Sequence, residues 1–290
     1  MPKLSHEVIT AVPVSFQDDG ALDLAGTRAI LQYVAESGVQ GALVLGTTGE
    51  FPALSIPERN TVAALAVEVL RDIRVIVHVG AASLYEVAQL IAGARAAGAR
   101  EIAILTPFYL PTPPAEVFAF FRDASTEADG LDVYVYLFEA RTGVRVDEEL
   151  LRQLAGLPNV VGVKVSGESL DRIAEFRAHL PADFRIYTGS DREFAAAVAA
   201  GADGVVSGVA SAFAKPFVAM RTALQHADTA AVTRLQEDVD EAVAAILGEP
   251  TRMRAVHRIA GRPVGRSRMP IPEPDPEALR RLARALPRFH

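Results

Sequence analysis

The amino-acid sequence predicts an α/β protein that folds as a (β/α)8 barrel, a TIM barrel, with a C-terminal helical appendix. Two observations predict it: short β-branched runs recur along the first two-thirds of the 290 residues, and Ala-, Leu- and Glu-rich stretches of helical length separate them. Strands that alternate with helices pair in parallel through crossover helices. The eight runs are 8–14, 42–45, 74–79, 101–105, 132–138, 160–165, 185–187 and 204–209.

Helical stretches between these runs include 56–69, 84–97, 114–127 and 147–155. Eight strand–helix units without a long interruption favour a closed barrel, with an open doubly wound sheet as the alternative. In a barrel the loops that follow the strands form the active-site face, so we expect the functional residues there.

The end of the chain has a different pattern. Strand-like runs stop at about Lys215, and the stretches 229–247 and 277–285 are typical of helices separated by a Pro- and Arg-rich segment, 262–276. We therefore divide the chain into a barrel at 1–214 and a helical region at 215–290 that packs on the barrel.

Composition excludes several classes of function. Half of the residues are hydrophobic and 22% are charged, which supplies enough apolar side chains for a large core. The net charge of −7 is not that of a nucleic-acid-binding or membrane-surface protein, so we expect neither partner. The absence of cysteine excludes disulfides and thiol catalysis. Without an apolar signal at its start or a membrane-spanning run, the protein is expected to be cytoplasmic.

Lysine is scarce in the sequence, and one of the three lysines, Lys164, lies inside the apolar run 160–165. Because side chains alternate across a strand, Val161, Val163 and Val165 would face the helices while Lys164 enters the barrel lumen. Desolvation there favours the neutral amine, which attacks ketones and forms an imine. The alternatives are a structural lysine paired with a buried carboxylate and a lysine at the solvent-exposed end of the strand.

Aromatic side chains share one face of the run 132–138, where Tyr134, Tyr136 and Phe138 would line the lumen. A phenol in that place can hydrogen-bond a substrate and transfer protons while an imine forms. An aromatic strand face is, however, more often part of a core.

Two loop features predict binding of carboxylates. The turn Gly-Thr-Thr-Gly-Glu at 46–50 follows a strand and offers hydroxyls and backbone N–H groups, although Thr and Gly are also common in ordinary loops. Arg141 follows another strand end, where its guanidinium can bind a carboxylate through two parallel hydrogen bonds. A surface arginine is the alternative for Arg141.

Taken in order, these motifs resemble the dihydrodipicolinate synthase and N-acetylneuraminate lyase family of class I pyruvate-dependent aldolases. Segment 46–50 matches the GTTGE loop of the family, 106–109 its TPYY segment, and 162–164 its GIK motif. Tyr136 and 141–143 match parts of YNVPxRTG. The resemblance runs from about residue 8 to at least residue 209, and it implies that Lys164 forms an imine with pyruvate or another 2-oxo acid.

The resemblance also implies roles for other matching residues. Tyr136 would transfer protons, Thr47 would link it to Tyr109 in a hydroxyl relay, and Thr48 would bind the pyruvate carboxylate. In the family the counterpart of Tyr109 enters from a neighbouring subunit, which implies a homo-oligomer, a dimer or a tetramer. The residues implied to line the pyruvate pocket are Gly189 and Val206.

Departures from the family pattern concern the second substrate. Phe138 should face the pocket, and Ser166 adds a lumen hydroxyl that would suit a polyhydroxylated sugar acid. Arg141 belongs to the synthase-like pattern and is absent from the sialic acid lyase motif. His78 stands where the family usually has a small residue, and we interpret it as a packed or solvent-facing histidine.

Three functions remain open at this point. The first is a lyase or synthase that joins pyruvate to an aldehyde or cleaves the product, nearest in motif to dihydrodipicolinate synthase. The second is a 2-oxo-3-deoxy sugar acid aldolase or dehydratase of the same family. The third is a non-catalytic barrel that binds a 2-oxo acid. The six histidines lack ligand spacing, so we expect neither a metal nor a cofactor besides the substrate imine.

Overall fold

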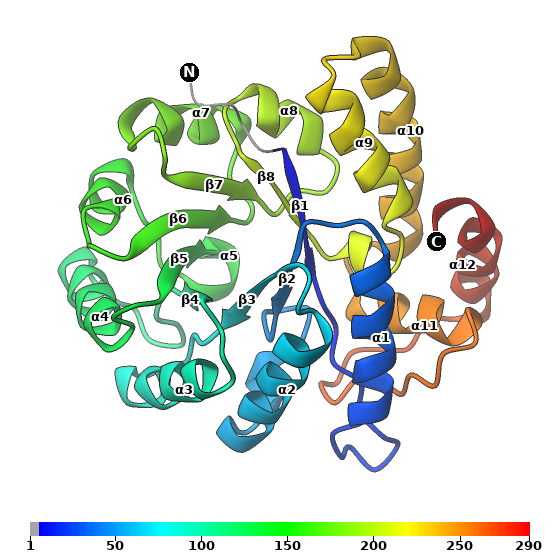
Figure 1. The fold of residues 1–290 in the computed structure, drawn as a ribbon, viewed down its shortest axis with the longest axis horizontal. Coiled ribbons are helices and arrows are strands. Elements are labelled where there is room, and N and C mark those ends of the chain that lie inside the picture. The colour runs from blue at the N-terminus through cyan, green and yellow to red at the C-terminus, as the bar shows by residue number, and fades with distance from the viewer. Residues whose placement is uncertain (1–5) are drawn as a thin grey trace.

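The computed structural model describes residues 6–290 as a closed barrel of eight parallel strands surrounded by helices (Figure 1). The first five residues, on which the expectation of no secretory signal partly rests, lie outside the described part. Strands pair in sequence order and β8 pairs with β1, so the predicted barrel is confirmed and the doubly wound sheet is excluded. The strands are β1 (Glu7–Ala11), β2 (Gly41–Val44), β3 (Arg74–His78), β4 (Glu101–Leu105), β5 (Asp132–Leu137), β6 (Val160–Val165), β7 (Arg185–Thr188) and β8 (Gly204–Ser207).

Helices follow the strands and cover the outside of the barrel. The four barrel helices expected from the sequence, α2, α3, α4 and α6, each begin and end within one residue of their expected limits. Three of them start after Ser55, Ser83 and Asp147, whose side chains accept a hydrogen bond from a first-turn N–H. The helices up to β8 are α1 (Leu24–Glu36), η1 (Phe51–Ala53), α2 (Ile56–Val69), α3 (Leu84–Ala96), α4 (Pro114–Glu127), α5 (Glu139–Thr142), α6 (Glu148–Ala155), α7 (Leu170–His179) and α8 (Phe194–Ala199).

Strand β6 departs from the alternation expected of it. Val133 pairs with Val160 and Tyr134 pairs with Gly162, so the register shifts by one residue between them. This β-bulge leaves Val161 as the extra residue. Its side chain packs inside the barrel, rather than against the helices, on a cluster made by Ile9, Leu43, Ile76, Ala103, Tyr134, Tyr187 and Val206. The prediction that Val161 faces the helices is therefore wrong, because periodicity does not reveal a bulge.

Beyond β8 the chain is helical, as expected, and the added helices gather on one side of the barrel (Figure 1). α9 follows β8 and contacts β1, so it is the eighth outer helix, although the division at residue 214 assigns it to the C-terminal region. α10 packs against α9 and α12, and α12 packs against α11. These elements are η2 (Val209–Ser211), α9 (Lys215–Gln225), α10 (Thr229–Ile246), α11 (Pro250–Ile259) and α12 (Pro276–Phe289).

Helix α11 was not expected from the sequence. Its buried face includes Arg254 and His257, both fully buried, so polar residues interrupt the apolar periodicity by which a helix is predicted. No helix within residues 6–290 is both long enough and apolar enough to span a bilayer.

Candidate active site

Lys164 lies near the carboxyl end of β6, and its side chain lines a cavity of about 210 Å³. The residue is 8% exposed. Its Nζ donates a hydrogen bond to Ser166 Oγ at 2.5 Å and lies 3.8 Å from the centroid of the Tyr136 ring. Among the described residues no carboxylate lies within ion-pair distance of Nζ. The alternative of a lysine paired with a buried carboxylate is therefore wrong.

Glycine at position 189 leaves the space that this amine occupies. A Cβ built on Gly189 would lie 2.5 Å from Ser166 Oγ and 3.1 Å from Lys164 Nζ. Contacts under 3.0 Å require something to move, so a larger residue here would displace Ser166, the hydrogen-bond partner of Lys164. Gly189 thus shapes the cavity where Lys164 reaches it.

Tyr136 connects Lys164 with the turn after β2. The phenol oxygen of Tyr136 lies 3.3 Å from Thr47 Oγ1. Burial by itself would raise the pKa of Tyr136, but the nearby Lys164 charge and hydrogen bonds from Lys164, Thr47 and Ser166 outweigh it and lower the pKa. A buried phenol with a lowered pKa, next to an amine, is suited to proton transfer.

The turn itself keeps two backbone donors available. The N–H groups of Gly49 and Glu50 bond to carbonyl oxygens within the turn, whereas those of Thr47 and Thr48 take part in no hydrogen bond among residues 6–290. With the two threonine hydroxyls, these N–H groups give the cavity an uncharged site for a carboxylate.

Of the two environments expected for His78, packed or solvent-facing, the structure shows the first, because the residue is fully buried. Burial, together with the positive charge of Arg59, lowers the pKa of His78 well below its ordinary value, so the ring is neutral. Nδ1 lies 2.9 Å from the carbonyl oxygen of Leu45, and the ring packs edge-on against Phe51 and Tyr136. His78 therefore supports the residue that precedes the turn.

The structure brings nearly all of the sequence-predicted site residues to one cavity. Those that line it are Thr47, Thr48, Tyr136, Phe138, Arg141, Lys164, Ser166, Gly189 and Val206. Tyr109 is the exception: it is 90% exposed and does not line the cavity. Within one chain, the hydroxyl relay predicted from Thr47 to Tyr109 is therefore incomplete.

Among the residues of the cavity wall that sequence reasoning missed are Asp191 and Met253. Burial raises the pKa of Asp191 to about 6, against opposing effects of Ser207 and Lys164, and its Oδ1 is buried without a hydrogen-bond partner. The sequence does contain a signal for Asp191, because it lies two residues after Gly189, which was expected to line the pocket. Met253 has no such signal, because it comes from α11, beyond the barrel.

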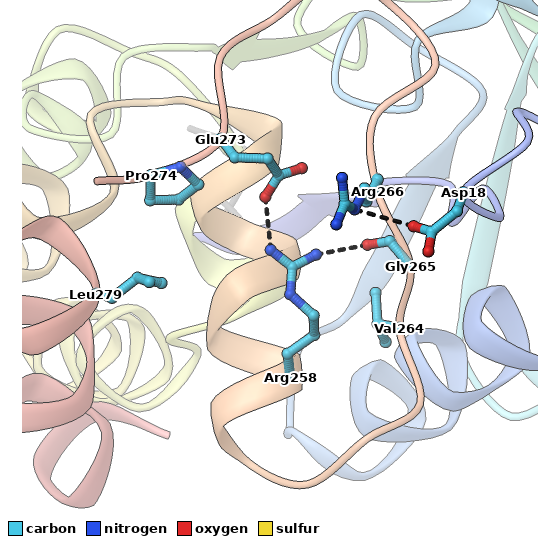
Figure 2. A pocket seen from close by; sticks show the side chains of 8 residues that line it. All are labelled: Asp18, Arg258, Val264, Gly265, Arg266, Glu273, Pro274 and Leu279. Carbon is cyan, nitrogen blue, oxygen red and sulfur yellow. Dashed lines mark hydrogen bonds and ion pairs between the residues drawn. The ribbon is translucent and has the colours of Figure 1, made fainter. Parts of the chain in front are cut away.

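A larger cavity of about 400 Å³ lies in the C-terminal region (Figure 2). Its charged side chains already pair with one another: Arg258 with Glu273 at 2.6 Å and Arg266 with Asp18 at 2.9 Å. None of the predicted site residues lines it. The chemistry is therefore assigned to the cavity at Lys164.

Comparison with known proteins identifies the family. The model of the dihydrodipicolinate synthetase family matches residues 4–288. The chain belongs to the dihydrodipicolinate synthetase family. The resemblance drawn from the motifs is confirmed, and so is the predicted enzyme class, a class I lyase.

The relatives carry two kinds of name. An N-acetylneuraminate lyase of Enterobacter sp. (strain 638) is 31% identical over 244 residues, 84% of this chain and 82% of that protein. A dihydrodipicolinate synthase from Thermotoga maritima superposes with a TM-score of 0.90 at 27% identity, over 98% of both chains. An Escherichia coli K12 prophage protein of the dihydrodipicolinic acid synthase family, solved in complex with pyruvate, superposes with a TM-score of 0.90 at 25% identity, also over 98% of both.

Proposed function

We propose that this enzyme joins pyruvate, or a related 2-oxo acid, to an aldehyde or cleaves the product, with Lys164 as the imine-forming residue. One observation carries the proposal: the Lys164 amine is buried in a cavity, has no carboxylate partner among the described residues, and faces the Tyr136 phenol. A buried amine that is not held in an ion pair can give up its proton and then react with a ketone.

The first half of the reaction builds the electron sink. Nζ of Lys164 adds to the C2 carbonyl carbon, and the resulting carbinolamine loses water to give the iminium. Tyr136 supplies the proton that leaves with the hydroxyl, and the bond from Thr47 holds the phenol in reach. Thr48 and the free N–H groups of the turn bind the C1 carboxylate.

The second half makes or breaks the carbon–carbon bond. In the cleavage direction the C4 hydroxyl gives up its proton, the C3–C4 bond breaks, and the electron pair moves into the iminium to form an enamine. Protonation at C3 and addition of water then release pyruvate and the free lysine. Each step uses groups of the chain and the substrate, so we propose that no metal or further cofactor takes part.

For the second substrate we propose an aldehyde that carries a carboxylate. Arg141 lines the rim of the cavity, and its side chain is exposed and lies over Phe138, 5.8 Å from the ring centroid. A guanidinium in this position can bind a carboxylate through two hydrogen bonds.

A 3-deoxy-2-oxo sugar acid is the second candidate. The Ser166 hydroxyl and the unpartnered Asp191 Oδ1 offer hydrogen-bonding groups to a polyhydroxylated chain. The similar N-acetylneuraminate lyases act, by their name, on such a sugar acid. Elimination of water from the same iminium is the dehydratase form of this candidate.

We further propose a cytoplasmic homo-oligomer, a dimer or a tetramer. Tyr109 is 90% exposed with a positive φ of 82°, and Leu110 beside it is 68% exposed. A second subunit that covers this segment would bury both apolar side chains and could bring a Tyr109 hydroxyl to the Thr47 of its neighbour.

The substrate proposal is tested by supplying aldehydes and 3-deoxy-2-oxo acids and measuring consumption or release of pyruvate. We expect Arg141→Ala to lose activity only on substrates with a second carboxylate. Arg145→Ala is the matched control, because Arg145 is exposed on the same connection and does not line the cavity. Equal loss on neutral aldehydes would contradict the role of Arg141, and no turnover of any compound would contradict the function.

A further inference from the structure

The turn that carries Thr47 is fixed at both of its ends. Leu45, just before it, has φ 62°, and Glu50, at its end, has φ 56°. Non-glycine residues hold such left-handed conformations only where their surroundings impose them. At the first end, His78 Nδ1 bonds to the Leu45 carbonyl oxygen.

At the second end, the Glu50 carboxylate is fully buried and all its partners come from the C-terminal region. Oε1 accepts a hydrogen bond from Arg254 Nη2 at 2.6 Å. Oε2 accepts from the backbone N–H of Met269 at 2.8 Å and of Arg268 at 3.1 Å. Arg254 is also fully buried, and its Nη1 donates to the carbonyl oxygen of Val14 at 2.8 Å.

A fully buried ion pair is a poor source of stability, because the cost of desolvating both charges can exceed their attraction. Such a pair does fix geometry, since each charge must keep its partner. Glu50 and Arg254 join the end of the catalytic turn to α11, and the residue before Arg254, Met253, lines the cavity. Helix α11 is thus linked to the site in two places.

We propose that Glu50 and Arg254 are positioning residues: through their ion pair the C-terminal region holds the turn so that Thr47 stays in hydrogen-bond distance of Tyr136. This proposal rests on the proposed imine chemistry. Its consequence is that a change at position 254, in a helix outside the barrel, slows a reaction at Lys164.

The variant that tests this is Arg254→Met, with Arg258→Met as matched control. Both remove a guanidinium from α11, and Arg258 pairs with Glu273 at 2.6 Å, the same distance as the Glu50 pair. Within residues 6–290 the hydrogen bonds of the Arg258 guanidinium go to Glu273 and to the carbonyl oxygen of Gly265, not to the turn (Figure 2). Because Arg254→Met leaves a buried carboxylate unpaired, the double variant Glu50→Gln with Arg254→Met is made as well, which removes both charges and restores stability.

The readouts are the rate of borohydride-trapped imine formation at saturating pyruvate, the pH profile of kcat, and the melting temperature. We expect imine formation to slow about 10- to 100-fold in Arg254→Met and in the double variant, and to stay within about twofold of wild type in Arg258→Met. Without the Thr47 bond, which lowers the pKa of Tyr136, the alkaline limb of the profile should move to higher pH.

A double variant with wild-type melting temperature, rate and pH profile would overturn the proposal, as would an equal slowing in Arg258→Met. If Arg254→Met and the double variant do not fold, Arg254→Lys decides: it keeps the charge with shorter reach, so a wild-type pH profile there overturns the proposal and a shifted one supports it. Failure of the proposed function is distinct, since wild-type protein would then form no trapped imine at all.

Discussion

The two ends of the barrel lumen differ in how Arg74 and Lys164, their positively charged side chains, are partnered. At the start of the strands, Arg74 bonds to Glu7 at 2.6 Å and to Glu101 at 2.5 Å, and it also donates to the hydroxyls of Tyr134 and Tyr187. At the other end, Lys164 has no ion-pair partner among the described residues. One end thus joins its strands through a cluster of charges, while the other leaves the Lys164 amine outside any ion pair, as the proposed imine chemistry requires.

The largest expected effect is that of removing the reactive amine. Lys164→Met should lower turnover about 10⁴-fold or more, because no imine can form, while the melting temperature stays near or above that of wild type. Lys215→Met is the control, since Lys215 is exposed at the start of α9, outside the cavity. A steady-state assay measures the turnover and calorimetry measures the melting temperature of each variant. Activity of Lys164→Met within tenfold of wild type would contradict the proposal that Lys164 forms the imine.

Substitutions at the opposite end of the barrel should lower the free energy of unfolding rather than the turnover. Arg74→Met removes the shared partner of Glu7 and Glu101 and should lower the free energy of unfolding by about 2 kcal/mol. Glu7 keeps its bond from the Tyr187 hydroxyl, and Glu101 keeps only a longer ion pair with Arg185 at 3.8 Å. Arg28→Met, which breaks the exposed pair with Glu68, should cost no more than about 1 kcal/mol. Urea denaturation measures both costs, and the folded Arg74 variant should retain its imine formation.

Two tyrosines on β5 sharpen the comparison, because they occupy successive lumen positions of one strand. Tyr136→Phe should lower kcat about 100-fold by removing the proton-transfer group while keeping the ring. Tyr134→Phe should leave kcat nearly unchanged and cost about 1–2 kcal/mol of stability, because it removes the bonds to Arg74 and Arg185. If both variants lost stability and neither lost turnover, Tyr136 would belong to the core.

The smallest expected effect concerns Asp191, whose pKa is raised to about 6. The folded protein then binds this proton more tightly than the unfolded chain, so stability falls as the pH rises from about 4 to about 6 and is constant above. Asp191→Asn should remove this dependence and stabilise the protein by about 1–2 kcal/mol at pH 7. Unfolding curves at several pH values measure it, and an unchanged dependence would mean that Asp191 ionises normally.

The barrel and the lumen position of Lys164 could be predicted from sequence because both follow from short-range periodicity. Eight strand-like runs alternate with helices, and a lysine at the lumen-facing parity of an apolar strand is unusual enough to attract attention. The bulge at Val161 could not be predicted, because it depends on pairing with β5. Lys164 faces the lumen as expected, because the bulge lies before it in the strand and leaves the alternation after Gly162 unchanged.

The residues that contact the site from outside the barrel could not be predicted from sequence either. Met253 and Arg254 reach the cavity and the turn from α11, far from β2 and β6 along the chain, and only the tertiary packing brings them there. In the sequence Glu50 is only the last residue of the GTTGE motif, because nothing near it along the chain indicates that it is buried or that it pairs with Arg254. The residues proposed to react are thus marked in the sequence more clearly than the residues proposed to hold them in place.

The most direct test of the account is trapping of the imine. The protein is incubated with pyruvate and borohydride, digested, and analysed by peptide mass spectrometry. The account predicts a reduced three-carbon adduct on the peptide that carries Lys164 and none on the peptide that carries Lys215. Absence of the adduct on Lys164, under conditions that label a known member of the family, would contradict it.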